Sequence, residues 1–207
     1  PIWRFPGCTI PSRHAEAGAE SPSSTSTTGF VDKRYFDWRV GMITGEINRT
    51  PAERVCVNLF ALAQASEHPI TVIISSPGGH VESGDMIHDT IKFIKPRVRV
   101  LGSGWVASAG ALVYIAADKK DRYILPNTRF LLHAPSGGVG GKVTDISIQA
   151  KEMLLMKDRL NKLFADATGQ PLKKVEKDTD RDFWLSGAEA IAYGLATHMI
   201  TSMSELK

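Results

Sequence analysis

Three polar residues of this chain have the types and surroundings that nucleophilic catalysis requires, and Ser108 is the first of them. It lies between an apolar run typical of a strand and one typical of a buried helix, with alanine and glycine around it. A serine at such a corner exposes its hydroxyl at the top of a sheet, and small neighbours let a substrate backbone approach. The helix that follows points free N–H groups at the site. Taken alone, the segment fits a plain helix N-cap better than a nucleophile.

His133 and Asp182 are the residue types that could assist such a serine. His133 ends an apolar run beside a glycine-rich stretch, although a lone histidine is usually a buried residue with its hydrogen bonds satisfied. Asp182 precedes a capped helix, and its carboxylate could hold a histidine tautomer and stabilise the imidazolium. By itself, Asp182 fits a solvated charge cluster better. We assign His80 to a turn and His88 to a helix surface.

The run Ser-Pro-Gly-Gly at 76–79 is a further candidate for chemistry. It ends one apolar run and opens a helix, and its two glycines allow positive φ and expose the N–H of Gly79. Such an N–H can stabilise a developing oxyanion in a transition state. A tight turn between strand and helix explains the run equally well.

Strand and helix signals alternate along the rest of the chain, which indicates an α/β fold. The glycine-bracketed segment 102–110 reads as a turn, and Ser186 with Glu189 forms a capping box for a last helix that Gly194 closes. Apolar runs predict strands at 39–45, 69–75, 98–101, 122–125 and 129–132, and apolar periodicity predicts helices at 51–65, 86–94, 109–117 and 145–166.

Composition narrows the function classes. The chain has 207 residues, of which 43% are hydrophobic. We expect residues 1–29, rich in Ser, Thr, Pro and Gly, to be a flexible N-terminal extension, and residues 30–207 to form one domain. A net charge of +3 with scattered Lys and Arg does not indicate nucleic-acid binding. No apolar run reaches membrane-spanning length.

Cysteine usage and motif content point away from disulfides, metals and cofactors. Cys8 and Cys56 do not make a disulfide framework, because Cys8 falls in the extension and Cys56 in a predicted helix; this favours a reducing compartment. No metal-binding or nucleotide-binding motif occurs. We therefore expect neither a metal ion nor a cofactor.

Taken together, the four elements resemble the Clp protease proteolytic subunit, the ClpP family of serine peptidases. The resemblance runs from about 39 to 197, in the order and at the separations that the family shows. It rests on SPGG at 76–79, A-S-x-G at 107–110, LPNTRFLLHAP at 125–135, TDI at 144–146, TGQ at 168–170 and KDTDRDFWLSGAEAIAYGLA at 177–196.

The resemblance implies a fold and a role for each site residue. The fold is a spiral of repeated strand–strand–helix units, shared with crotonases, with a protruding handle helix that begins near Thr144. Ser108 would be the nucleophile, His133 the general base and then acid, and Asp182 the residue that orients His133. The N–H groups of Gly79 and Ala109 would form the oxyanion hole. An edge strand made of Gly137, Gly138, Val139, Gly140 and Gly141 would pair with the substrate.

The resemblance also implies an assembly. Two seven-membered rings of identical subunits would stack around a closed chamber, with Asp180 and Arg181 bridging the rings. Inside it, a serine endopeptidase would cut unfolded proteins and short peptides. An AAA+ unfoldase would supply the substrate and use the ATP, in a bacterial-type cytoplasm rather than an organellar matrix.

The chain departs from the family pattern in several places. Ala109 replaces the usual Met, residues 104–106 replace a Gln-rich stretch, and Gly140 and Lys142 stand where Gln is common. The axial-pore segment and first helix of the family are not recognisable in residues 1–38.

The sequence supports three other functions less well. An enoyl-CoA hydratase-like enzyme shares the spiral fold and the oxyanion N–H groups but needs no Ser–His–Asp set. A purely structural ring subunit typically lacks one of the three residues, and all three are present here. A Ser–Lys signal-peptide peptidase requires a membrane anchor, of which the sequence shows no sign.

Overall fold

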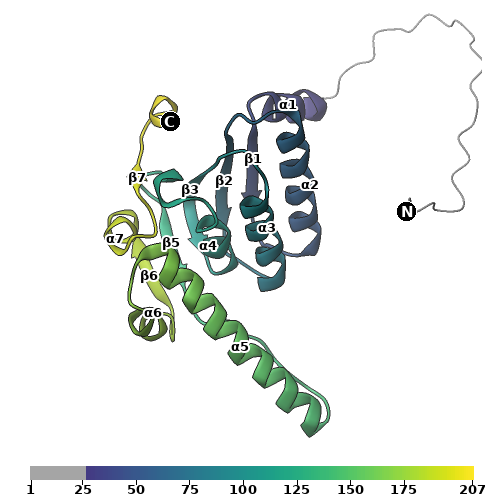
Figure 1. Cartoon of the computed structure of the whole chain (residues 1–207), viewed down its shortest axis with the longest axis vertical. Coiled ribbons are helices and arrows are strands. Elements are labelled where there is room, and N and C mark those ends of the chain that lie inside the picture. The colour runs from purple at the N-terminus through teal and green to yellow at the C-terminus, as the bar shows by residue number, and fades with distance from the viewer. Residues whose placement is uncertain (1–26) are drawn as a thin grey trace, which may run out of the picture.

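Parallel strands form the centre of the fold, and helices cover them (Figure 1). The computed structural model describes residues 27–207. The main path of the sheet runs in the order β1-β2-β3-β4-β7, and every pair along it is parallel. These strands span Val40–Thr44, Ile70–Ser76, Val98–Ala107, Arg122–Ile124 and His198–Met199.

The third strand, β3, belongs to two groups of strands. Its first half pairs with β2 and β4. Towards its end β5 (Arg129–Leu132) replaces β4 as a partner, while Val106 still pairs with Ser76 of β2; β5 is itself paired with β6 (Phe183–Ser186). The predicted turn at 102–110 was therefore wrong for residues 102–107, which continue the strand. The glycines in this segment resemble turn signals, but they serve a register shift where β3 changes partners.

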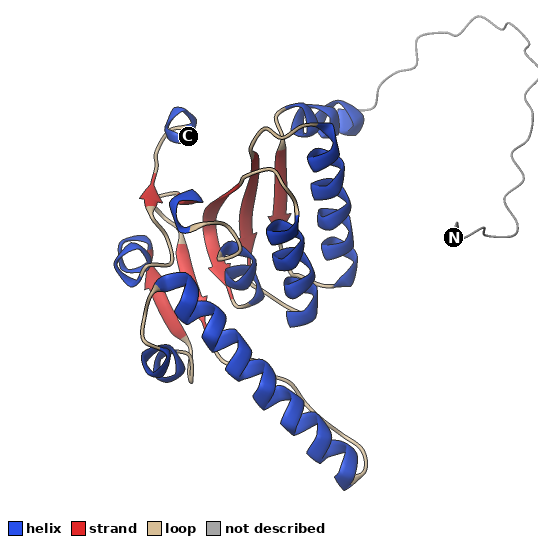
Figure 2. Cartoon of the chain, viewed as in Figure 1, coloured by secondary structure: helices blue, strands red, loops and turns tan. Residues whose placement is uncertain are grey.

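Most predicted helices are confirmed, with shifted ends. Figure 2 shows α2, α3 and α4 packed along one side of the parallel strands. The helix predicted at 51–65 starts two residues earlier, where the Asn48 side chain accepts a hydrogen bond from the Thr50 N–H at 3.2 Å. The helix predicted at 86–94 starts earlier, at Val81, and the helix predicted at 109–117 ends earlier, at Tyr114, while the helix predicted at 145–166 extends by two residues at each end. These helices are α2 (Arg49–Ala65), α3 (Val81–Phe93), α4 (Ala109–Tyr114), α5 (Val143–Thr168) and α7 (Gly187–Tyr193).

Several features were missed or misassigned. His88, which we assigned to a helix surface, is 8% exposed, because its face of α3 packs against the fold. Two helices were not predicted, α1 (Thr27–Asp37) and α6 (Leu172–Asp178), nor were the short strands β6 and β7 and the 3-10 turns Lys119–Asp121 and Met203–Glu205. Residues 1–26 of the predicted extension, with Cys8, lie outside the described residues, so the domain division stays a prediction.

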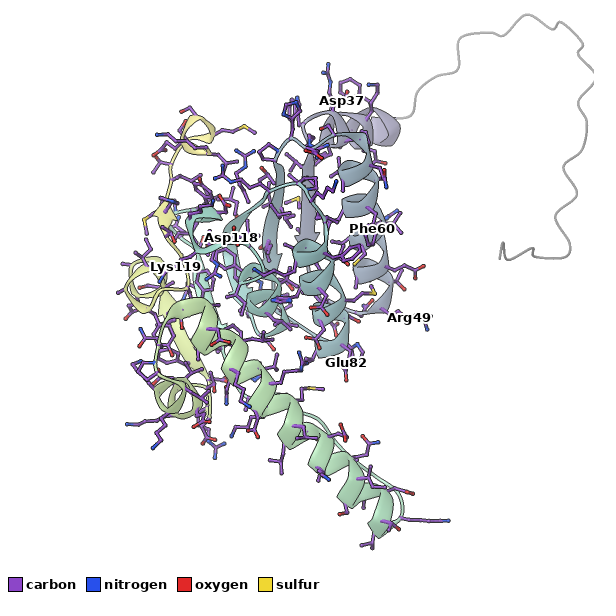
Figure 3. The ribbon with its side chains drawn as sticks, viewed as in Figure 1. Asp37, Arg49, Phe60, Glu82, Asp118 and Lys119 are labelled. Carbon is purple, nitrogen blue, oxygen red and sulfur yellow. The ribbon has the colours of Figure 1, made fainter. Side chains whose placement is uncertain are left out.

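Helix α5 has two unlike halves. Its C-terminal half packs on the body through buried residues such as Leu160 and Phe164, and Gly169 ends it in a left-handed conformation at φ 79°. Its N-terminal half projects away from the body, and Figure 3 shows the side chains there standing clear of the other elements. Large apolar side chains are exposed on this half, among them Val143 at 85% and Leu154 at 63%. This is the handle helix that the family resemblance implies.

No helix among residues 27–207 has the length and apolar character needed to cross a membrane.

A buried arginine joins the ends of two helices. The Arg122 guanidinium is almost fully buried and donates hydrogen bonds to the carbonyls of Ala117 at 2.9 Å, Ile115 at 3.0 Å and Ala167 at 2.8 Å. These carbonyls lie at or just after the ends of α4 and α5, where backbone acceptors have no partner within the helix. Burial lowers the pKa of Arg122, yet a guanidinium stays charged in proteins. The charge is thus satisfied by the helix ends.

We expect Arg122→Leu to lower the free energy of unfolding by about 3 kcal/mol or more, because three buried carbonyls lose a charged donor. Urea unfolding followed by circular dichroism, at one protein concentration, measures the loss. Lys95→Ala is the control, since this lysine side chain is 87% exposed and its removal should change stability by less than about 0.5 kcal/mol. Equal stability of the two variants would contradict the role of Arg122.

Candidate active site

Three strand ends bring the candidate catalytic residues to one edge of the sheet. β3 and β5 run parallel, so Ser108 and His133, each the first residue after its strand, leave the sheet on the same side. β6 runs antiparallel to β5 with Phe183 opposite Leu132. Extending this register by one residue sets Asp182 opposite His133. Residues far apart in the sequence therefore meet through strand pairing.

Ser108 occupies a strained corner between strand and helix. Its backbone has φ 52° and ψ −119°, a region that residues other than glycine rarely adopt. Its N–H donates to the Leu131 carbonyl at 2.8 Å, and its own carbonyl accepts from the first turn of α4. Ser108 thus lies at a strand-to-helix corner, as the sequence suggested, and the plain N-cap alternative fails because the side chain caps no backbone N–H.

Gly78 packs against this corner, and Gly79 packs against the backbone of Ile47. The two glycines have φ 93° and φ 142°, both in the region that favours glycine. A Cβ on Gly78 would lie 2.6 Å from the Ser108 Cβ and 2.8 Å from the Ala107 carbonyl oxygen. Gly78 is therefore needed for close approach to the serine, a role that sequence reasoning missed although the double glycine pointed to it.

Two backbone donors near the serine have no acceptor. Hydrogen bonds with Ile47 engage the carbonyl of Gly78 and the N–H of His80, each at 2.8 Å, which fixes the backbone on either side of Gly79. Within residues 27–207, neither Gly79 nor Ala109 uses its own N–H. The same segment therefore forms a tight turn and presents a free N–H donor, two interpretations that the sequence left as alternatives.

A small apolar pocket opens beside Ser108 and His133. Both residues are half-buried and line it, together with side chains from α3, α4, α5 and β5. The apolar and small lining residues are Val81, Ala109, Leu112, Leu132, Pro135, Leu160 and Phe164.

The three polar residues are close in topology but not joined by hydrogen bonds. None is found among the side chains of Ser108, His133 and Asp182, although the Ala134 N–H donates to the Thr179 carbonyl at 2.6 Å and ties the two segments together. Asp182 is exposed. Catalytic hydrogen bonds are often long in the absence of substrate, so the arrangement remains suited to acid–base work.

The remaining predicted site residues lie around α5. Residues 137–141 form no strand in this single chain and are exposed; a Cβ on Gly137 would lie 3.6 Å from the Met153 methyl, so the segment starts alongside α5. Asp180 is held by Lys157 at 3.0 Å, and this hydrogen bond lowers the pKa of the carboxyl. Arg181 is exposed and forms no ion pair with residues 27–207.

No group of three His, Cys, Asp or Glu side chains that could hold a metal ion occurs in the part of the chain that the structure describes.

Comparisons with known proteins agree on one family. The profile described as Clp protease matches residues 25–203. An ATP-dependent Clp protease proteolytic subunit of Paracoccus denitrificans is 54% identical over 190 residues, which cover 92% of this chain and 94% of the relative. A subunit named ATP-dependent Clp protease proteolytic subunit 3, from Rhizobium etli, is 57% identical over 176 residues, 85% of this chain and 91% of its own.

A solved structure gives the same result for the fold. ClpP1 from Listeria monocytogenes superimposes with a TM-score of 0.78 at 49% sequence identity, covering 86% of this chain and 99% of that one.

We expect Ser108→Gly to raise the free energy of unfolding by up to about 1 kcal/mol. Removing the Cβ relieves a strain of about 1–3 kcal/mol, part of which is offset by the greater freedom of glycine in the unfolded chain. Ser108→Ala keeps the Cβ and should leave stability within about 0.5 kcal/mol. Urea unfolding of the two variants beside the parent makes the comparison, and a glycine variant no more stable than the alanine variant would argue against strain.

Proposed function

The chain belongs to the Clp protease family of serine peptidases, and we propose that Ser108, His133 and Asp182 are its catalytic triad. The observation that carries the proposal is the meeting of three strand ends at one edge, with the serine on a strained corner against Gly78. Backbone strain of this kind persists only where the surrounding structure enforces it, and such positions cluster at active sites.

The chemistry follows from the positions of these groups. The Ser108 hydroxyl attacks the substrate carbonyl carbon while His133 accepts its proton, and the carbonyl oxygen becomes an oxyanion. The unused N–H groups of Gly79 and Ala109 stabilise that charge. His133 then gives the proton to the leaving amine, the C–N bond breaks, and water hydrolyses the acyl-enzyme by the same steps. Asp182 orients His133 and stabilises the imidazolium.

We place the substrate between the serine and the glycine-rich segment. The apolar lining of the pocket beside Ser108 favours an apolar side chain next to the scissile bond. Residues 137–141 belong to neither a helix nor a strand, and they are exposed. Their backbone groups are therefore open to pairing with an extended peptide. The substrate itself would complete the edge strand that the single chain lacks.

We also propose the assembly of the family for this chain. The exposed apolar side chains on the outer half of α5 need a partner surface, which a second ring would supply, giving two stacked seven-membered rings with Asp180 and Arg181 at the contact. A closed chamber excludes folded proteins, so an AAA+ unfoldase is the proposed source of substrate. The named relatives are ATP-dependent and bacterial, which supports this partner and a cytoplasmic location.

The test of the triad is Ser108→Ala. Loss of the nucleophile should reduce hydrolysis of fluorogenic peptides by at least about 1000-fold and abolish labelling by a fluorophosphonate probe. Ser204→Ala, on the exposed 3-10 turn Met203–Glu205, is the matched control and should keep both activities. Activity of the Ser108→Ala protein above the background of a purified preparation would refute the assignment.

Ring contacts and catalysis should be coupled, because Arg181 directly precedes Asp182. We expect Arg181→Ala to lower the sedimentation coefficient of the assembly and the peptidase rate together, with Arg54→Ala on the exposed surface of α2 as the control. Sedimentation velocity and the peptide assay are run on the same samples. A variant that forms single rings yet keeps full activity would disprove the coupling.

A further inference from the structure

An ion pair joins two of the helices that form the walls of the pocket beside Ser108. Arg159 of α5 donates two parallel hydrogen bonds to the Asp85 carboxylate of α3, at 2.8 and 2.6 Å. Bidentate pairs of this kind are among the stronger hydrogen-bonded contacts in proteins. The Asp85 side chain is 21% exposed and the Arg159 side chain is 45% exposed, so the pair is partly withdrawn from solvent. We refer to the pair as the Asp85–Arg159 bridge.

The bridge lies next to side chains that line the pocket. On α3, Asp85 follows the lining residue Val81 by four residues, so the two side chains share a face of the helix, one turn apart. On α5, Arg159 directly precedes the lining residue Leu160. Figure 3 labels Glu82 at this end of α3, beside the middle of α5. The bridge therefore sets the separation of two walls of the pocket.

The two helices are held in different ways. The helix α3 packs tightly on the serine corner, because a Cβ on Gly84 would lie 3.2 Å from the Cβ of Ala109. The helix α5 is bonded on another side, through Lys157 and Asn161, to the turn at 179–180. In the described part of the chain, the bridge supplies the only hydrogen bonds and the only ion pair between α3 and α5. Without the bridge, only apolar contacts would hold these two walls together.

The pocket has little room while its walls keep this separation. Its free volume is about 20 Å³, close to the space that a single water molecule needs. The floor is densely packed, since Leu112 is 1% exposed and Leu132 is 0% exposed. A bulky side chain can therefore enter only if α3 and α5 move apart, and this movement requires the bridge to open.

We propose that the Asp85–Arg159 bridge determines substrate specificity, because it holds the pocket walls together and so favours a small apolar side chain next to the scissile bond. Neither residue lines the pocket, so both are positioning residues that act through Val81 and Leu160. Loss of the bridge frees α5 to move away from α3, and larger side chains such as phenylalanine are then accepted. The proposal rests on the proposed peptidase function and adds a size limit to it.

Matched peptides test the size limit. Quenched fluorescent peptides carry Ala, Leu or Phe at one of the two positions that flank the scissile bond, and mass spectrometry of the products identifies the cleaved bond. At one of these positions, we expect kcat/KM of the parent protein to fall from Ala to Phe. Arg159→Gln should raise the Phe-to-Ala ratio of kcat/KM about fivefold, the scale of one well-formed ion pair. A parent that prefers Phe at both positions, or a ratio that Arg159→Gln leaves unchanged, would overturn the proposal.

Variants separate the bridge from a general effect on the fold. Asp85→Asn should raise the same ratio, and the double variant with Arg159→Gln should raise it no further, because both changes remove one bridge. Arg159→Lys keeps the charge without the bidentate geometry and should give an intermediate ratio. Lys162→Gln removes an exposed charge from the same helix and should leave the ratio intact. A loss of kcat/KM shared equally by all peptides would assign the bridge a purely structural role and count against the proposal.

Binding without catalysis distinguishes this proposal from the proposed function. In the Ser108→Ala protein, fluorescence anisotropy should show that Arg159→Gln tightens binding of a labelled Phe peptide about fivefold relative to its Ala counterpart. Cleavage by the Ser108→Ala protein would count against the triad, whereas an equal effect on both peptides would count against the bridge. Sedimentation velocity of Arg159→Gln should match the parent; dissociation would assign the effect to assembly and overturn the proposal.

Discussion

The change of partners along β3 is the constraint on which the rest of the structure depends. Its first half is bonded to β2 and β4, and its end to β2 and β5, so the sheet divides at Gly102, where β5 takes the place of β4. The Gly102 carbonyl is satisfied there by the Leu125 N–H at 3.0 Å and the Thr128 hydroxyl at 2.8 Å. Because β5 continues the ladder, the strand extends to the corner where Ser108 sits. Without that division, the serine, the histidine and the aspartate would have no common edge.

A strained corner needs a rigid support, and α4 provides it. All six of its residues are buried, and the Tyr114 hydroxyl donates to the Tyr123 carbonyl at 3.0 Å while its ring packs edge-on against Phe130 at 5.0 Å between centroids. Arg122 fixes the carbonyls beyond the end of the same helix. The unfavourable φ of Ser108 is therefore held by packing and hydrogen bonds that are already satisfied elsewhere.

Local signals in the sequence predicted the elements whose causes are local. Ile70–Ser76 was recognised because its β-branched residues are buried on both faces, and α7 because Ser186 and Glu189 cap it reciprocally. β6 and the end of β3 were missed because both depend on pairing with strands that are distant in the sequence. Spacing and resemblance indicated the candidate triad, but the close approach of Gly78 and the contact of Asp85 with Arg159 arise only when distant segments pack together.

Helix α5 connects the projecting handle to the candidate active site. Four residues apart on α5, Lys157 binds Asp180 at 3.0 Å and Asn161 accepts a hydrogen bond from the Thr179 hydroxyl at 2.8 Å. The Thr179 carbonyl in turn receives the Ala134 N–H beside His133. Two bonds from one helix face thus fix the turn that leads into Asp182.

The outer half of the same helix exposes its apolar side chains. A partner surface that buried this half would therefore bind a helix whose other half already holds the turn before Asp182. The single chain leaves Ser108, His133 and Asp182 without hydrogen bonds to one another. The turn that carries Asp182 is thus attached to the same helix that carries the exposed apolar surface. The exposed surface of the handle and the position of the candidate triad are in this way linked through one helix.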